Sequence, residues 1–171
     1  RLDYDLGHLA GRTYWQTVAD DLDRSLTAET LSALIAADLD LWTVPNQPMI
    51  DWAAALQRHA LLTGILSNMG DVMEEGIMAR LAWMATFPVR IFSHRLGLAK
   101  PDERIYRHAI SALGVAPDEI LFLDDRLENV EAARALGLHA IHYSSHGDLQ
   151  RAFVAAGFTG LPQPPAGPSI Q

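Results

Sequence analysis

The sequence predicts an α/β fold, in which a doubly wound parallel sheet core follows a small all-helical cap at the N-terminus. Beyond residue 60, short apolar runs of strand length alternate with helical patterns. These runs are apolar on both sides of the pleat, as is typical of parallel strands that helices cover on both faces. Before residue 49 the apolar residues recur only at helical spacings, which predicts the cap.

The cap is predicted at residues 1–48. From residue 11 to 41, apolar side chains recur every three or four positions, as on one face of a helix. Thr27 precedes the second half of this pattern and is a candidate N-terminal helix cap. The turn-rich stretch VPNQP at 44–48 ends the cap and is a plausible hinge.

The core is predicted at residues 49–160, beginning with a helix at 49–60. Strands are expected at 61–67, 89–93, 119–125 and 139–143, separated by helices near 70–85, 102–113, 127–136 and 146–156. The proline-rich tail at 161–171 lacks the pattern of a helix or central strand. We expect it to be an extended strap or disordered.

Composition bounds the function. The net charge of −8 is spread without a basic stripe, which disfavours nucleic-acid binding. The chain has no cysteine, so disulfides, thiolate zinc sites and cysteine nucleophiles are excluded. No apolar run reaches the ~20 residues of a membrane span. We expect a cytoplasmic protein without a membrane partner, and the sequence leaves its oligomeric state open.

Polar residues follow three of the predicted strands. Ser67 and Asn68 follow the first, Lys100 lies in the loop after the second, and Asp124 and Asp125 end the third. Because ligands of parallel α/β sheets bind beyond the carboxyl ends of the strands, these residues are expected to converge. The set suits phosphoryl transfer to water, with donors for phosphate oxygens, a cation, and carboxylates for a metal.

The acidic pair and the lysine are the informative members of this set. Two adjacent carboxylates are costly unless a cation such as Mg²⁺ lies beside them or one takes a proton. Lys100 is the only lysine, against twelve arginines, which indicates a position that requires a compact ammonium. Each residue also has a structural interpretation: Ser67 and Asn68 as a turn, Asp125 as a helix cap, and Lys100 as a solvated loop residue.

Two other residue types are assigned structural roles. The seven histidines show no ligand spacing, so His94, His139 and His142 are interpreted as polar residues with satisfied hydrogen bonds. The four tryptophans, Trp15, Trp42, Trp52 and Trp83, are expected to pack in the core or cap.

The sequence resembles the haloacid dehalogenase (HAD) superfamily. The stretches ILSN at 65–68, SHRLGLAKPDERIY at 93–106 and ILFLDDRLENVEAARALG at 120–137 are similar to its second, third and fourth motifs in order and spacing. The similarity covers roughly residues 5–157. It is greatest to the small sugar-phosphate phosphatases and the amino-terminal phosphatase domain of soluble epoxide hydrolase.

The resemblance implies a Mg²⁺-dependent phosphatase with a Rossmann-like core, which hydrolyses a small phosphomonoester through an aspartyl-phosphate. Carried over to this chain, Ser67 and Asn68 would hold the phosphate oxygens, and Lys100 would steady both the nucleophile and the phosphoryl group. Asp125 would bind Mg²⁺, with Asp124 beside it as a second acidic group. Asn129 would lie just behind them, where relatives often carry an acidic residue.

The family's first motif, an apolar strand ending in Asp-x-Asp that supplies the nucleophile, is not visible. Asp3 and Asp5 have its spacing, but only Arg1 and Leu2 precede them, too few for a buried strand. In this fold the strand lies between those ending at Ser67 and Asp124. We therefore expect an upstream segment to supply it, and the chain as given to be inactive without it.

Two other functions stay open. A catalytically silent phosphate-binding or regulatory protein of the same fold becomes preferred if the upstream sequence lacks the Asp-x-Asp pair. A receiver-like phosphoacceptor domain also uses an acidic pair, a hydroxyl residue and a lysine. There the acidic pair closes the first strand, whereas here it follows both Ser67 and Lys100, so the chain order argues against it.

Overall fold

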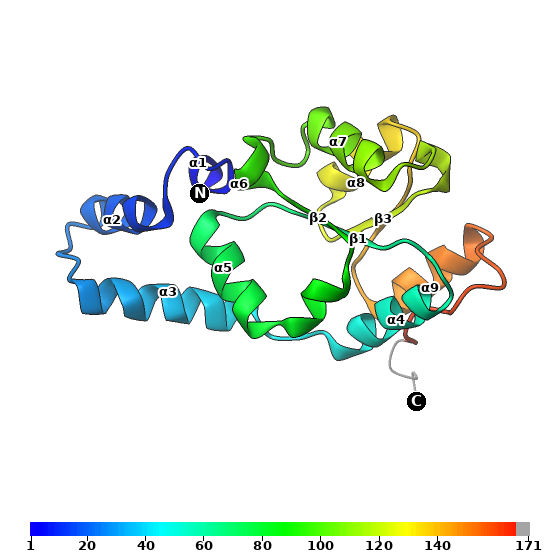
Figure 1. Cartoon of the computed structure of the whole chain (residues 1–171), viewed down its shortest axis with the longest axis horizontal. Coiled ribbons are helices and arrows are strands. Elements are labelled where there is room, and N and C mark those ends of the chain that lie inside the picture. The colour runs from blue at the N-terminus through cyan, green and yellow to red at the C-terminus, as the bar shows by residue number, and fades with distance from the viewer. Residues whose placement is uncertain (167–171) are drawn as a thin grey trace. The chain divides into compact units, whose positions relative to one another are not determined.

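The computed structural model describes residues 1–166, so the last five residues of the predicted tail lie outside the described part (Figure 1). The chain divides into two compact units. The first comprises Arg1–Pro45 and Ile65–Ala99, and the second comprises Asn46–Gly64 and the chain from Lys100 onward. Since each unit draws on both the predicted cap and the predicted core, the predicted domain boundaries stay a prediction.

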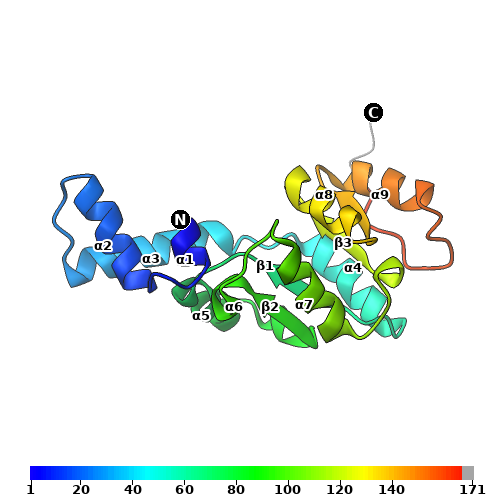
Figure 2. The ribbon, with the colours of Figure 1, turned by 90° about the horizontal axis from the view of Figure 1, so that it is seen from above.

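The first unit contains five α-helices, a 3-10 helix and two strands, β1 and β2, which pair with each other (Figure 2). Its elements are α1 (Leu2–Asp5), α2 (Gly11–Asp21), α3 (Ala28–Trp42), β1 (Gly64–Ser67), α5 (Asp71–Arg80), η1 (Ala82–Thr86), β2 (Val89–Phe92) and α6 (Ser93–Leu96). Thr27 caps α3 as predicted, since its hydroxyl accepts a hydrogen bond from the Thr30 amide at 3.1 Å.

The core of the first unit lies where α3 packs against α5 (Figure 1). Leu39 of α3, Met73 and Ile77 of α5, and Phe92 of β2 are buried there. Of the four tryptophans expected to pack inside, Trp42 does not, because it is 60 % exposed near the end of α3. Its indole nitrogen instead donates to Asp38 on the helix surface.

The second unit contains a parallel strand pair with helices packed against it. Its elements are α4 (Gln47–Arg58), α7 (Glu103–Leu113), η2 (Pro117–Glu119), β3 (Leu121–Asp124), α8 (Leu127–Ala135), β4 (His139–His142) and α9 (His146–Ala155). The register of β3 and β4 places Leu121 opposite His139 and Asp124 opposite His142. Helix α8 lies against both strands (Figure 2).

The apolar core of this unit joins distant parts of the sequence. Trp52 of α4 is buried with Ile141 of β4 and Phe153 of α9. Residues 161–166 form neither helix nor strand, and they contribute to this core as a strap. Leu161 packs against the core, and the indole nitrogen of Trp52 donates to the carbonyl of Pro162 at 2.8 Å.

The predicted fold class is confirmed, but the strands form two separate pairs, β1 with β2 and β3 with β4. Each pair contains one of the two strands, ending at Ser67 and Asp124, that the sequence prediction placed beside the missing first-motif strand. Within residues 1–166, no helix combines the length and apolarity that crossing a membrane requires.

Candidate functional site

A buried ion pair lies at the carboxyl end of β3. The Lys100 ammonium donates to Oδ2 of Asp124 across 2.7 Å, and the two side chains are only 11 % and 4 % exposed. The ammonium also lies 5.7 Å from the centre of the Phe122 ring, within the range of a cation–π contact. The predicted proximity of Lys100 and Asp124 is therefore present in the structure.

The second carboxylate oxygen of Asp124 is also engaged. Oδ1 accepts from the Asn129 side-chain amide at 2.8 Å and from the Arg126 backbone amide at 2.9 Å. Burial raises the pKa of Asp124, but the hydrogen bond and charge of Lys100 and the two amide donors outweigh burial and hold it below its ordinary value. Asp124 is thus a fixed, charged carboxylate.

Tyr106 supports Asn129 from behind. The Tyr106 side chain is fully buried in α7, and its hydroxyl donates to the backbone carbonyl of Asn129 at 3.0 Å. Burial first, and then the nearby charge of Asp124, raise the pKa of Tyr106, so the phenol stays a donor. This bond fixes the backbone of Asn129, whose side chain in turn holds Asp124.

Asp125 differs from its neighbour, because its side chain is exposed. In the part of the chain that the structure describes, its carboxylate makes no hydrogen bond or ion pair, while its backbone carbonyl accepts from His142 Nε2 at 2.9 Å. Residues 1–166 contain no group of three acidic, histidine or cysteine side chains suited to a metal. The residues present therefore fit one carboxylate ligand of Mg²⁺, supplied by Asp125, and not a complete coordination shell.

Ser67 and Asn68 lie in the first unit. Ser67 is the last residue of β1, and Asn68 begins the β1–α5 loop, which we define as residues 68–70. Both residues are half-buried. The structure thus brings Lys100, Asp124 and Asp125 together in the second unit, and convergence of Ser67 and Asn68 with them stays a prediction.

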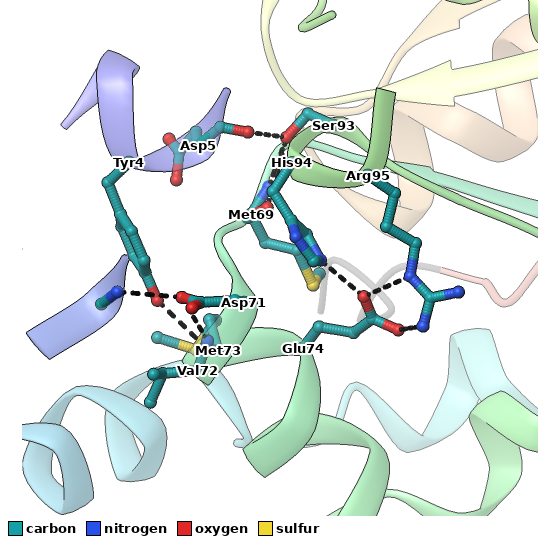
Figure 3. A network of polar contacts seen from close by, with 11 residues as sticks. Tyr4, Asp5, Met69, Asp71, Val72, Met73, Glu74, Ser93, His94 and Arg95 are labelled. Carbon is teal, nitrogen blue, oxygen red and sulfur yellow. Dashed lines mark hydrogen bonds and ion pairs between the residues drawn. The ribbon is translucent and has the colours of Figure 1, made fainter. Parts of the chain in front are cut away.

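A network of polar contacts surrounds the β1–α5 loop (Figure 3). The hydroxyl of Ser93, a fully buried residue, accepts from the Met69 backbone amide at 2.9 Å and contacts the backbone carbonyl of Asp5. The Tyr4 hydroxyl accepts from the Met73 amide at 3.2 Å. The network therefore joins the N-terminal segment, which we define as residues 4–11, to the residues that follow Asn68.

The same network contains a buried carboxylate with two basic partners. Oε2 of Glu74 lies 2.6 Å from His94 Nε2 and accepts from Arg95 Nε at 2.8 Å, and its other oxygen accepts from Arg95 Nη2 (Figure 3). His94 is therefore a hydrogen-bonded polar residue, as its sequence context predicted. The pairing satisfies a charge that would otherwise be costly to bury.

Asp3 and Asp5 lie in α1, a short helix. Their position in a helix agrees with the sequence argument that they do not end a buried strand.

Comparison with known protein families decides the identity of the fold. A model of the haloacid dehalogenase-like hydrolases matches residues 7–137, which is more than half of the chain. The chain belongs to this family. The resemblance predicted from the three motifs is thereby confirmed.

Among curated proteins, this HAD-like hydrolase is similar to several enzymes. It is 30 % identical to bifunctional epoxide hydrolase 2 of Rattus norvegicus over 124 residues, which are 70 % of this chain but 22 % of that enzyme. It is 31 % identical to N-acetylmuramic acid 6-phosphate phosphatase of Pseudomonas aeruginosa over 93 residues, covering 54 % of this chain and 41 % of that enzyme. The chain thus spans less than half the length of these two relatives.

Solved structures support the fold. A HAD family enzyme of Bacteroides thetaiotaomicron, determined as a magnesium complex, superposes with a TM-score of 0.69 at 18 % identity, covering 89 % of this chain and 78 % of that one. The L-2-haloacid dehalogenase of Xanthobacter autotrophicus superposes with a TM-score of 0.62 at 22 % identity, covering 84 % and 58 %. At such identities the likeness concerns the fold alone.

Sequence reasoning missed three buried, hydrogen-bonded residues of this HAD-like hydrolase: Ser93, Tyr106 and Glu74. Ser93 was detectable, because it is a polar residue directly after an apolar strand, as Asn68 is. Tyr106 and Glu74 lie on helices, in α7 and α5, where a polar side chain is ordinarily solvated. Only the folded structure shows that both are buried and hydrogen-bonded.

Proposed function

We propose that this HAD-like hydrolase is a Mg²⁺-dependent phosphatase for a small phosphomonoester, acting through an aspartyl-phosphate. The family and the phosphatases among its relatives support this activity. The observation that carries the proposal is the unequal pair at the end of β3: Asp124 is buried and paired with Lys100, while the side chain of the adjacent Asp125 is exposed. We assign no residue in the described range 1–166 as the nucleophile.

Each side chain has a definite task in this proposal. Ser67 and Asn68 donate hydrogen bonds to phosphate oxygens, which are stabilised by donors fixed in advance. Lys100 neutralises negative charge shared between the phosphoryl group and its attacking oxygen. Asp124, held by Asn129 and Arg126, keeps the ammonium in place and does not itself need to move.

Asp125 is the proposed Mg²⁺ ligand. A hard cation prefers carboxylate oxygens, and Asp125 offers one that no other described group engages. When bound, the cation supplies charge stabilisation to the phosphate oxygens. Asp124 instead accepts hydrogen bonds on both carboxylate oxygens, from Lys100, Asn129 and the Arg126 amide, so the two aspartates are given different roles because their contacts differ.

The test is p-nitrophenyl phosphate turnover by the natural full-length protein that contains this chain, with and without Mg²⁺. We expect Mg²⁺-dependent turnover that Asp125→Asn reduces by at least roughly 100-fold, as is typical for the loss of one catalytic charge. Asp118→Asn, the same change at another exposed aspartate of this unit, is the matched control and should leave the rate unchanged.

Binding supplies a second readout. Mg²⁺ should raise the unfolding temperature of the wild-type protein and of Asp118→Asn, but not that of Asp125→Asn, because a ligand stabilises only the state that binds it. Equal rates and equal Mg²⁺ responses for all three proteins would refute the assignment of Asp125.

A second candidate is a phosphate-binding protein without catalysis. It becomes preferred if the sequence upstream of Arg1 lacks the Asp-x-Asp pair, since Asp3 and Asp5 lie in a helix. This candidate predicts that the full-length protein binds inorganic phosphate but does not hydrolyse p-nitrophenyl phosphate at any Mg²⁺ concentration. Turnover that depends on Asp125 decides for the phosphatase.

A further inference from the structure

Ser93 joins two backbone segments that are far apart in the sequence. Its hydroxyl has one proton to donate and two lone pairs to accept with. One lone pair accepts from the Met69 amide at 2.9 Å, and the Asp5 carbonyl is the nearest acceptor for the proton, with the Met69 carbonyl at 3.3 Å. Since Ser93 is fully buried, water has no access to replace these bonds.

The Met69 amide belongs to the peptide plane that directly follows Asn68. A hydrogen bond to this amide therefore restrains the orientation of the Asn68–Met69 peptide plane, and so the dihedral angle ψ of Asn68 and the direction of its side chain. Ser67 is the preceding residue and is held in β1. Ser93 thus acts on the same short stretch that the proposed function assigns to phosphate binding.

The N-terminal segment, residues 4–11, packs closely against the β1–α5 loop and the start of α6. A Cβ atom at Gly70 would lie 2.1 Å from the Tyr4 ring, and one at Gly7 would lie 2.5 Å from the His94 carbonyl oxygen. The backbone amide of Gly11 donates to the Asp71 carboxylate at 3.0 Å. Only glycine allows such close approach at Gly70 and Gly7, so this contact is closely packed and specific.

We propose that Ser93 is a positioning residue for phosphate binding: its hydroxyl locks the Asn68–Met69 peptide against the N-terminal segment and so aims Ser67 and Asn68 at the phosphate. This inference rests on the proposed function, and it extends the site to residues that touch no substrate. The N-terminal segment is then a structural part of the phosphate site, through Asp5 and Tyr4 (Figure 3).

The test uses Ser93→Ala in the natural full-length protein, with inorganic phosphate as the probe. Removing the hydroxyl leaves the buried Met69 amide without its partner and frees the Asn68–Met69 peptide. We expect the dissociation constant for phosphate, measured by calorimetry, to rise about tenfold, which corresponds to one hydrogen bond's contribution. Hydrogen exchange at the Met69 amide should accelerate, while circular dichroism shows a folded protein.

Ser32→Ala is the matched control. The Ser32 hydroxyl also donates to a backbone carbonyl, that of Ala28, but it lies on the exposed face of α3. Phosphate affinity should be unchanged in this variant. A folded Ser93→Ala protein that has a lower unfolding temperature but wild-type phosphate affinity would show a merely structural role and overturn the inference.

Tyr4→Phe is the second test variant, to be used if Ser93→Ala does not fold. It keeps the ring against Gly70 and removes only the bond to the Met73 amide. We expect phosphate affinity to fall about twofold to threefold, since this bond is further from Asn68. Unchanged affinity would overturn the role of the N-terminal segment.

The proposed function and this inference fail differently. A wild-type protein that binds no phosphate refutes the proposed function and the inference with it. A wild-type protein that binds phosphate, with Ser93→Ala binding equally well, refutes only the positioning role.

Discussion

Lys100 and Asp124 form a pair in which each residue depends on the other. Both side chains are largely buried, and the Asp124 carboxylate accepts hydrogen bonds from Lys100, Asn129 and the Arg126 amide. Removing one member of a buried ion pair is strongly destabilising because the other charge is left without a partner. The pair is therefore important to stability as well as to the proposed chemistry.

Lys100→Met tests this dependence. We expect the free energy of unfolding at pH 7 to fall by about 3 kcal/mol, since Asp124 then lies buried without its cation. Urea denaturation measures the change. The double variant Lys100→Met, Asp124→Asn removes the uncompensated charge and should recover part of the loss; a double variant as unstable as Lys100→Met would contradict the electrostatic explanation.

The difference in free energy of unfolding between the wild type and Lys100→Met should depend on pH. The pKa of Asp124 lies below its ordinary value of 3.8 in the folded protein, so the pair contributes its stability above pH 3.8. The contribution is lost as the pH falls through the folded-state pKa. Urea denaturation should therefore show that the difference in free energy of unfolding between the wild type and Lys100→Met becomes smaller as the pH is lowered from 5 to 3. A difference that does not change with pH would exclude the titration of Asp124 as its cause.

The residue types at strand ends and the proximity of Lys100 to Asp124 were predictable from the sequence, but the other hydrogen bonds of Asp124 were not. Ser67, Lys100, Asp124 and Asp125 stood out because polar residues interrupt apolar patterns there. The Asp124 carboxylate is bound by Lys100, 24 positions before it in the sequence. The rule that ligands bind beyond the carboxyl ends of parallel strands predicted this proximity, but no sequence pattern shows that Asn129 and the Arg126 amide hold the other oxygen of Asp124.

At the scale of elements, helix ends are held by short polar side chains. Asp102 caps α7, because its carboxylate accepts from the Arg104 amide at 2.9 Å, and Gly114 ends this helix in a left-handed conformation with φ of 69°. Ser145 caps α9 in the same way as Thr27 caps α3. These caps satisfy amides that have no partner within the helix.

Thr27→Ala should lower the free energy of unfolding by about 1 kcal/mol, the usual cost of losing an N-terminal cap. The affected helix, α3, carries Leu39 into the core of the first unit. Chemical denaturation measures the loss. Thr17→Ala is the matched control: the Thr17 hydroxyl donates to the Thr13 carbonyl within α2 and caps nothing, so its loss should cost clearly less.

The pKa of Asp102 can be measured directly. The hydrogen bonds from the Arg104 side chain and backbone amide lower the pKa of Asp102 to about 2. The cap is therefore charged at all pH values above 3.8, and its stabilising effect is lost as the pH falls through about 2. Carboxyl NMR shifts should show this midpoint, and Arg104→Gln should move it upward toward 3.8; a midpoint unaffected by the substitution would exclude the arginine as the cause.

Element types were predictable and boundaries were not. The strand predicted at 61–67 begins only at Gly64, because the Leu61 amide closes the end of α4 on the Leu56 carbonyl. The helix predicted at 70–85 is split, since Leu81, with φ of −111° and ψ of 78°, interrupts it between α5 and η1. In both places local backbone hydrogen bonding and geometry override an apolar pattern that the sequence continues.

At the scale of the whole chain, segments remote in sequence complete each core. The strap at 161–166 covers the core of the second unit, where the Pro162 carbonyl accepts from Trp52, 110 positions earlier, and Pro164 is buried. Composition predicted that this stretch would lack helix and strand. Nothing in its composition identifies Trp52 as its partner, since proline-rich segments bind through shape and backbone carbonyls.

Truncation after Gly160 tests the strap. It removes the acceptor of the Trp52 indole and the Leu161 side chain, and so exposes apolar surface of the core. We expect a lower unfolding temperature and red-shifted tryptophan emission. Removal of residues 167–171 alone leaves every strap contact described here and is the control; equal stability of the two truncated proteins would contradict the role of the strap.

The solitary lysine has one more consequence, which concerns chemical labelling. Lys100 carries the only side-chain amine in the sequence, and that amine is buried against Asp124. An amine-selective acylating reagent should therefore leave the Lys100 side chain of the native protein unmodified and react with it as the site opens or unfolds. Mass spectrometry of the peptide containing Lys100 would measure the rate at which this one amine is acylated, and so how often the ion pair is exposed to solvent.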